Sequence, residues 1–220
     1  MTNIISILLL SFSLLNSGVN KKTIIEQNEL HNNPIKHIAN QEQSIAVFAS
    51  GCFWCVEAVF ESVNGVSEAV SGYTGGKKRN ANYEAVSAGI TDHAESVQIF
   101  YNPNIISYET LLEVFFGSQD PTTLNQQGND KGRQYRSTIF YANEIEKKSA
   151  ENYIIKLTSE KVFDSKITTT LEKLTTFYPA EDYHQNYEKL HPNQSYVKNV
   201  SVPRLNRFKK KFPHLLKSNQ

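Results

Sequence analysis

The feature that most constrains this chain is the stretch Ala49-Ser50-Gly51-Cys52-Phe53-Trp54-Cys55-Val56-Glu57, which holds both cysteines and the only tryptophan of the 220 residues. The residues before it, 44–48, form an apolar run that favours a strand. After it, apolar residues recur at the spacing of one helix face: Val56, Val59, Phe60 and Val63. The sequence therefore predicts that the two cysteines lie where a strand turns into a helix.

This position favours reactive thiol chemistry. A thiol at a helix N-terminus lies near free backbone N–H groups and the positive end of the helix dipole. Both stabilise the thiolate, which is the reactive form of cysteine. Cys52 is the residue best placed for this effect. Phe53 and Trp54 follow it directly and predict an apolar wall beside the sulfur.

Three interpretations of the Cys52 and Cys55 spacing compete. Two cysteines three residues apart can simply be buried and pack as small hydrophobic side chains. A structural zinc site is a weaker interpretation, because zinc takes four ligands and a single CxxC pair supplies two. Redox or nucleophilic chemistry is the third, since CxxC is a common redox pattern. The rest of the chain has to decide between them.

Length and charge restrict the possible classes of protein. With 220 residues, the chain can form one domain with a core, or one domain and an appendage. A net charge of +1 provides no overall field for a nucleic acid, so no nucleic-acid partner is expected. Basic residues gather near the end of the chain, and we expect residues 201–220 to be a solvated basic tail: Arg204, Arg207, Lys209, Lys210 and Lys211.

The N-terminal segment is unusually apolar. Residues 4–15 form an apolar run that is broken only by serines, with the length of a signal-peptide core and too short to span a bilayer comfortably. No Lys or Arg precedes it, so two interpretations of residues 1–20 stay open. They are a signal peptide, which implies a periplasmic or cell-envelope protein, or an apolar extension on a cytoplasmic protein. Residues 21–43 are polar and are interpreted as a linker.

Strand and helix patterns alternate through residues 44–200. Strands are expected at 66–73, 95–101, 136–141 and 167–174, and helices near 108–115 and after Asn143, which has Glu146 in a capping position. A polar loop at 118–134 is long enough to be functional or disordered. These elements predict a two-layer α+β domain with a mixed sheet and helices packed on it.

Four polar segments hold the candidate site. They are Gly51-Cys52-Phe53-Trp54; Tyr83 with His93-Ala94-Glu95; Gly128-Asn129-Asp130-Lys131-Gly132-Arg133-Gln134-Tyr135-Arg136-Ser137; and Ala180-Glu181-Asp182-Tyr183-His184-Gln185. In this order they resemble the motifs of the A-type peptide methionine sulfoxide reductases. The resemblance covers about residues 44–190.

The resemblance implies a fold, a reaction and a set of roles. The fold is a ferredoxin-like α+β core. The reaction is reduction of the S-epimer of methionine sulfoxide, in oxidised proteins or free, without a cofactor or metal. The implied roles are a nucleophile, Cys52; a pocket for the substrate's methyl group, Phe53 and Trp54; groups that hold the sulfoxide oxygen, Glu95, Tyr83 and Tyr135; and part of a polar network behind them, Asp130. His184 is interpreted as structural.

These residue types suit the chemistry. A sulfoxide sulfur becomes electrophilic when its oxygen gains a proton or a strong hydrogen bond. A carboxylic acid among aromatic rings keeps its proton longer, because burial disfavours the charged form, so Glu95 fits a general acid. Tyrosine hydroxyls add fixed donors. Attack by Cys52 leaves a sulfenic acid, which a second thiol converts to a disulfide that an outside dithiol reduces.

The second cysteine departs from the family pattern. Cys55 stands where glycine is common in the family, and no cysteine follows it. The sulfenic acid must be resolved by Cys55 or by an outside thiol. We expect Cys55, with thioredoxin or a similar dithiol recycling the disulfide, although Cys55 faces the core side of the expected helix. A monomer is expected. Two other functions stay open: a thioredoxin-like disulfide exchanger and a non-catalytic module that binds methionine sulfoxide.

Overall fold

The computed structural model describes residues 43–218. The apolar segment at 4–15 and nearly all of the polar linker lie outside the described residues, so their interpretations stay predictions. Within residues 43–218, no helix is both long and apolar enough to cross a membrane.

A six-stranded sheet runs through the described region, in the order β7-β6-β1-β3-β2-β8. Its strands are β1 (Ser44–Ser50), β2 (Val66–Thr74), β3 (Ala94–Tyr101), β6 (Ser137–Tyr141), β7 (Thr170–Lys173) and β8 (Tyr178–Pro179). A separate two-stranded hairpin joins β4 (Gln126–Gln127) to β5 (Asp130–Lys131). The helices are α2 (Phe53–Glu61), α3 (Tyr83–Ser87), α4 (Tyr108–Gly117), α5 (Glu144–Ser159), α6 (Tyr187–Leu190) and α7 (Val202–Lys211).

The sheet is mixed, as expected. Strand β6 pairs in parallel with β7, while β1 pairs antiparallel with both β3 and β6, and β2 pairs antiparallel with β3 and β8. The first elements of the described chain follow one another as β1-α2-β2-β3-α4, and β6 completes a βαββαβ series. Short α3 is inserted between β2 and β3, and the β4–β5 hairpin between α4 and β6.

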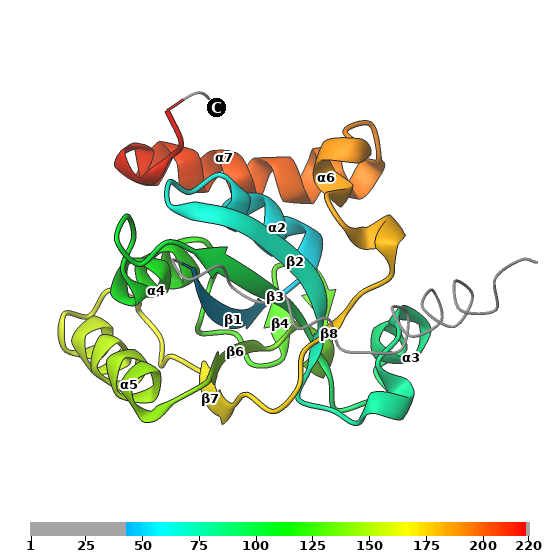
Figure 1. The fold of residues 1–220 in the computed structure, drawn as a ribbon, viewed down its shortest axis with the longest axis horizontal. Coiled ribbons are helices and arrows are strands. Elements are labelled where there is room, and N and C mark those ends of the chain that lie inside the picture. Colours follow the sequence, from blue (N-terminus) through cyan, green and yellow to red (C-terminus); the bar gives the residue numbers. More distant parts are fainter. Residues whose placement is uncertain (1–42, 219–220) are drawn as a thin grey trace, which may run out of the picture. The chain divides into compact units, whose positions relative to one another are not determined.

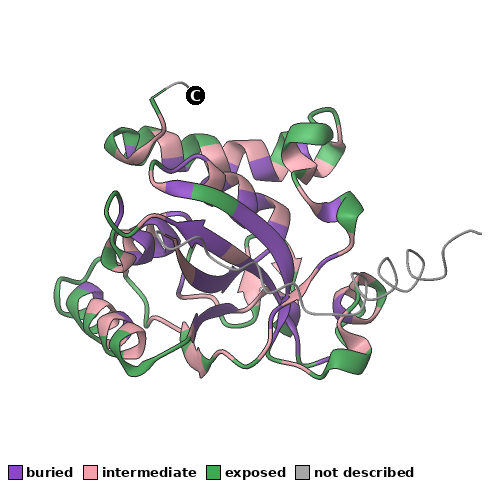
Figure 2. Cartoon of the chain, in the orientation of Figure 1, coloured by how far each residue is buried: buried purple, intermediate pink, exposed green. Residues whose placement is uncertain are grey.

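The two faces of the sheet are buried in different ways. Alternate residues of β1 face opposite sides, because successive side chains of a strand point to opposite faces. Ala46 and Phe48 join a large core together with residues of α2, α4, α5 and α7. Val47 and Ala49 join a smaller cluster that includes Phe140 and Phe177. The central strands are accordingly buried along most of their length (Figure 2).

Local signals explain where the helices begin. The Asn143 side chain accepts a hydrogen bond from the Glu146 N–H at 2.9 Å, and the Glu146 carboxylate accepts one from the Ala142 N–H at 2.7 Å. This reciprocal arrangement confirms the capping pair at the start of α5. Ser107 caps α4 in the same way through the Thr110 N–H.

Two expectations need correction. The strand expected at 167–174 is shorter, because pairing with β6 covers Thr170–Lys173 alone. The basic tail is not simply solvated: it contains helix α7, which packs along α2 (Figure 1). Arg204 and Phe208 of α7 are 7% and 1% exposed. Their i, i+4 spacing places both on the face turned to the core.

Candidate active site

The turn that carries Cys52 depends on the glycine before it. Gly51 has a φ of +89°, and a Cβ built on it would lie 2.6 Å from the Cβ of Gln127. Both the backbone conformation and the close approach exclude a side chain. Cys52 then occupies the N-cap position of α2, and its carbonyl accepts the Val56 N–H at 3.3 Å. The predicted junction of strand and helix is confirmed.

A pocket of about 320 Å³ opens beside this turn. It brings together seven of the eight predicted site residues: Cys52, Phe53, Trp54, Tyr83, Glu95, Asp130 and Tyr135. Cys55 is absent from the lining. Gln194 and Tyr196 complete the lining, and no sequence motif had pointed to them.

Glu95 is the buried acid of this pocket. It lies on β3 and is 2% exposed. Burial raises the pKa of its carboxyl to about 8, and the nearby negative charge of Asp130 adds to the effect. The Phe53 N–H donates to Glu95 Oε2 at 3.0 Å, and this hydrogen bond partly opposes the rise in pKa. Because the raised pKa exceeds 7, most Glu95 carboxyls keep their proton at neutral pH.

Two tyrosines, Tyr83 and Tyr135, line the same pocket. Tyr83 begins α3, where the Asn82 side chain caps the helix, and its ring stacks on Phe53 with 6.4 Å between centroids. Tyr135 ends the 3-10 turn Arg133–Tyr135. Burial raises the pKa of both hydroxyls, and the negative charge of Glu95 adds to this. Both therefore remain hydrogen-bond donors at neutral pH.

Asp130 and Tyr196 both line the pocket. The Tyr196 hydroxyl donates to Asp130 Oδ2 at 2.5 Å and lies 3.9 Å from the Cys55 sulfur. Burial raises the pKa of Asp130, while Tyr196 and Arg204 oppose the shift. The polar network expected behind the oxygen-binding groups thus runs from Asp130 through Tyr196 to Cys55.

The two thiols differ in a way that the helix N-terminus alone does not explain. Burial raises the pKa of Cys52 well above its ordinary value, and the neighbouring Cys55 and Glu95 charges raise it further. A hydrogen bond from Cys52 lowers the pKa of Cys55 to about 6, with help from the positive charge of Arg204. The expectation that Cys52 holds the thiolate is therefore wrong for the reduced protein at rest, because burial outweighs the helix dipole.

His184 holds the tryptophan in place. The Trp54 Nε1–H donates to His184 Nδ1 at 3.1 Å, and Tyr187 stacks on the Trp54 ring at 3.8 Å. Burial lowers the pKa of His184. Because Nδ1 accepts this bond, the neutral ring carries its proton on Nε2, which lies 3.9 Å from Glu181. The structural interpretation of His184 agrees with these contacts.

Glu181, in the fourth motif segment (residues 180–185), forms hydrogen bonds with residues around the pocket, including Tyr83. Its carboxylate accepts hydrogen bonds from the Tyr83 N–H at 3.0 Å and the Tyr73 hydroxyl at 2.8 Å. Although burial alone raises the pKa of Glu181, these hydrogen bonds bring it below its usual value. The carboxylate is therefore charged at neutral pH and fixes Tyr83 at the start of α3.

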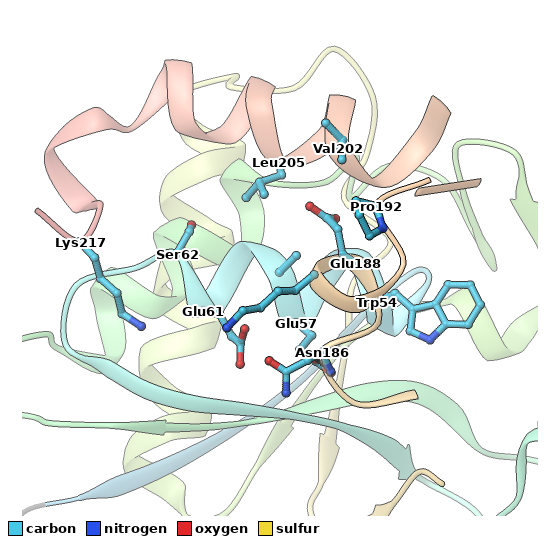
Figure 3. A pocket seen from close by; sticks show the side chains of 12 residues that line it. Trp54, Glu57, Glu61, Ser62, Asn186, Glu188, Pro192, Val202, Leu205 and Lys217 are labelled. Carbon is cyan, nitrogen blue, oxygen red and sulfur yellow. Dashed lines mark hydrogen bonds between the residues drawn. The ribbon is translucent and has the colours of Figure 1, made fainter. Parts of the chain in front are cut away.

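A larger pocket of about 540 Å³ shares Trp54 with the first and lies between α2, α6 and α7 (Figure 3). It contains no cysteine, so the smaller pocket is the candidate active site. Glu57, on α2, lines the larger one and is 2% exposed. Its carboxylate accepts hydrogen bonds from the Ser71 hydroxyl and the Asn186 N–H. Burial nevertheless raises the pKa of Glu57 to about 7.

Glu57 makes the stability of the protein depend on pH. Because the folded-state pKa is raised, its contribution to stability is present below the ordinary glutamate pKa and is lost as the pH rises through about 7. Glu57→Gln should therefore match wild type near pH 4 and exceed it at pH 8 by on the order of 1–3 kcal/mol. Urea unfolding at both pH values measures this, and equal pH slopes for the two proteins would contradict it.

A cysteine thiol, a protonated acid and aromatic rings in one pocket are the features of a thiol-dependent oxidoreductase. The family described as peptide methionine sulfoxide reductase matches residues 44–216. This chain belongs to that family, and it is an oxidoreductase that acts on methionine sulfoxide.

Individual relatives agree with this assignment. Peptide methionine sulfoxide reductase MsrA from Acinetobacter baumannii strain AYE is 49% identical over 173 residues, which are 79% of this chain and 98% of the relative. Reduced Mxr1 from Saccharomyces cerevisiae is 33% identical with a TM-score of 0.66, over 70% of this chain and 88% of Mxr1. Mxr1 in complex with Trx2 matches at 26% identity with a TM-score of 0.50, over 69% and 91% of the two chains.

Proposed function

We propose that this chain reduces the S-epimer of methionine sulfoxide, in oxidised proteins and free, through a sulfenic acid on Cys52. The observation that carries this proposal is the buried Glu95 carboxyl in the pocket of Cys52, protonated at neutral pH. A thiol beside a neutral acid is the pair needed to attack a sulfoxide sulfur and protonate its oxygen.

The pocket walls suit the two ends of the sulfoxide group. Phe53 and Trp54 present their rings to the methyl group, and His184 and Tyr187 hold Trp54 in a fixed orientation. The sulfoxide oxygen points to Glu95 and to the hydroxyls of Tyr83 and Tyr135. Glu95 Oε2 is engaged by the Phe53 N–H, so Oε1 is the oxygen available to the substrate. Donors fixed in advance stabilise the charge that develops on oxygen.

The first step transfers oxygen to Cys52. The Cys52 proton passes to its hydrogen-bond partner Cys55, and the resulting thiolate attacks the substrate sulfur while Glu95 protonates the oxygen. The sulfur–oxygen bond of the substrate breaks, methionine leaves, and the hydroxyl ends on Cys52 as a sulfenic acid. Two electrons pass from Cys52 to the substrate sulfur.

The second step forms a Cys52–Cys55 disulfide. The Cys55 sulfur attacks the Cys52 sulfur, the S–O bond of the sulfenic acid breaks, and the hydroxyl leaves as water with the proton from the thiol. Residues three apart at a helix start have Cα atoms about 5–6 Å apart, which a disulfide accepts. Thioredoxin or a similar dithiol then reduces the disulfide. The complex of the relative Mxr1 with the thioredoxin Trx2 supports this recycling.

We also infer that the core is ferredoxin-like. The βαββαβ series gives the strand order β6-β1-β3-β2 with antiparallel pairs throughout, and this topology supports the assignment. We propose that the catalytic domain begins at residue 44, as the sequence predicts, and that α7 is part of it. The monomeric state stays a prediction.

One assay separates the candidate functions. The reduced protein is incubated with dithiothreitol and each epimer of a methionine sulfoxide. We expect turnover of the S-epimer and none of the R-epimer. A disulfide exchanger turns over neither epimer but reduces a model disulfide, and a binding module binds the sulfoxide without forming methionine.

The resolving role of Cys55 has its own test. One turnover without reductant should consume both thiols, form one methionine and leave a Cys52–Cys55 bond detectable by mass analysis. A stable dimedone adduct on Cys52 with Cys55 still free to alkylate would contradict this role and indicate an outside thiol as the resolver.

A further inference from the structure

The turn at residues 184–187 contacts Trp54 at both of its ends. His184, at the start of the turn, accepts the Trp54 Nε1–H at 3.1 Å. Tyr187, at its end, stacks on the indole with 3.8 Å between ring centroids and 8° between ring planes. Gln185 and Asn186 connect these two residues. The orientation of Trp54 therefore depends on what fixes the turn.

Strand β2 binds the first half of the turn. The Ser71 N–H donates to Gln185 Oε1 at 3.0 Å, and Gln185 Nε2 donates to the Ser71 carbonyl at 3.0 Å. The pairing of β2 with β8 covers Gly72 and Tyr73. The Gln185 amide therefore binds the next backbone N–H and C=O of β2 in place of a strand residue, and it fixes the backbone directly after His184.

A buried carboxyl binds the second half of the turn. Glu57 is 2% exposed and lies three residues after Trp54 on α2, so the two side chains are neighbours on the helix surface. Its Oε2 accepts from the Ser71 hydroxyl, and its Oε1 accepts from the Asn186 N–H. Trp54, Glu57 and Asn186 all line the larger pocket (Figure 3). The carboxyl thus anchors the backbone directly before Tyr187.

The conformation of Asn186 gives this anchor its importance. Asn186 has a φ of +54° and a ψ of +29°, in the left-handed region. Residues other than glycine adopt this region at an energetic cost, which asparagine tolerates better than most. Tyr187 follows at the start of α6. A hydrogen bond to the Asn186 N–H helps to hold a conformation that would otherwise relax and carry Tyr187 away from Trp54.

Glu57 is buried at a cost to stability. Within residues 43–218, no side-chain nitrogen of Lys, Arg or His lies within 4.0 Å of its carboxyl oxygens. Two hydrogen bonds compensate the burial of a carboxyl only in part. A locally unfavourable choice of this kind is typical of a functional site.

We propose that Glu57 is a positioning residue for Trp54. By holding the Asn186 N–H, its carboxyl keeps Tyr187 stacked on the indole. Trp54 lines the pocket of Cys52 as well as the larger pocket, so a shift of its ring changes the space offered to the substrate's methyl group. This deepens the proposed function and rests on it for the catalytic consequence alone.

The first measurement uses the fluorescence of Trp54, which is the only tryptophan of the chain. Acrylamide quenching of the reduced protein at neutral pH, without substrate, measures how well the indole is covered. Glu57→Ala removes both acceptors and should raise the quenching constant above that of wild type. Glu57→Gln should match wild type, because its amide can accept from the Asn186 N–H and donate to the Ser71 hydroxyl.

Single-turnover reduction of the S-epimer measures the consequence. Glu57→Ala should raise the substrate concentration that gives half the maximum rate by roughly tenfold or more, because a small displacement of a binding group can cost up to about 10²-fold. Glu57→Gln should restore the wild-type value. A purely structural role would lower the fraction of active protein and leave this concentration unchanged.

Glu61→Ala is the matched control. Glu61 lies one turn further along α2 and lines the same larger pocket, and within residues 43–218 it makes no hydrogen bond to the turn. Both measurements should give the wild-type result. If Glu57→Ala does not fold, Glu57→Leu takes its place, since it keeps most of the volume and has no acceptor.

Two results would overturn the proposal. One is quenching equal to wild type in folded Glu57→Ala or Glu57→Leu. The other is Glu57→Gln that behaves like Glu57→Ala. Raised quenching with an unchanged half-saturating concentration would support the positioning of Trp54 and contradict its part in the proposed function, so the two failures are distinguishable.

Discussion

Cys52→Ser should abolish reduction of the S-epimer of methionine sulfoxide. A serine hydroxyl in the same buried position is a far weaker nucleophile at neutral pH. Methionine formation measured with dithiothreitol as reductant should fall to background. Retained turnover in this variant would show that another group attacks the sulfoxide.

Cys55→Ser is the matched control for this loss, because it removes the other thiol and leaves the pocket lining intact. It should still form methionine once per protein, more slowly because Cys55 no longer accepts the Cys52 proton, and leave a sulfenic acid on Cys52 that dimedone traps. Recycling by thioredoxin should then fail, while dithiothreitol should support slow turnover. If Cys52→Ser and Cys55→Ser lose the first turnover equally, the two thiols do not have separate roles.

Glu95→Gln should lower the rate of the sulfoxide-reducing step by roughly 10²-fold or more, the usual effect of losing a general acid. Glutamine keeps the shape and a hydrogen-bond donor but has no proton to transfer. Single-turnover methionine formation measures this step separately from recycling. Glu84→Gln, an exposed glutamate on α3, is the control and should react like wild type.

The pH profile gives an independent test of Glu95. Its raised pKa means that the acid form dominates below about pH 8 and is lost as the pH rises through that value. The single-turnover rate of wild type should therefore fall above about pH 8, while the residual rate of Glu95→Gln should lack this limb. A wild-type rate that rises through pH 8 and 9 would mean that the proton comes from elsewhere, and the tyrosines would be the next candidates.

The sequence predicted the pocket better than its electrostatics. Glu95, Asp130 and Tyr135 lie far apart in the chain, yet their motifs place them in one pocket with Cys52, as the structure shows. The prediction that Cys52 is ionised was wrong, because the helix N-terminus is a local signal whereas burial depends on the whole fold. Nothing in the sequence near Cys52 shows that its side chain ends 6% exposed.

Two residues of the site were missed for different reasons. Tyr196 belongs to no recognisable motif, and its role depends on contacts with Asp130 and Cys55 that only the tertiary structure creates. Arg204 had a usable signal, because Phe208 follows it at i+4 and Phe212 at i+8, which marks one buried helix face. That signal was outweighed by the general rule that clustered basic residues lie in solvent.

The Arg204 side chain donates a hydrogen bond to the Ser50 carbonyl, and this contact has a consequence for synthesis of the protein. The two residues are 154 positions apart, so the ribosome synthesises the cysteine turn long before it synthesises α7, which carries Arg204. A nascent chain that ends near residue 190 already contains all four motif segments but lacks Tyr196, Arg204 and the helix that packs on α2. During that interval the motif segments are all present, but the thiols lack the Tyr196 and Arg204 side chains. The pocket lining is therefore complete only when the last part of the described chain has docked.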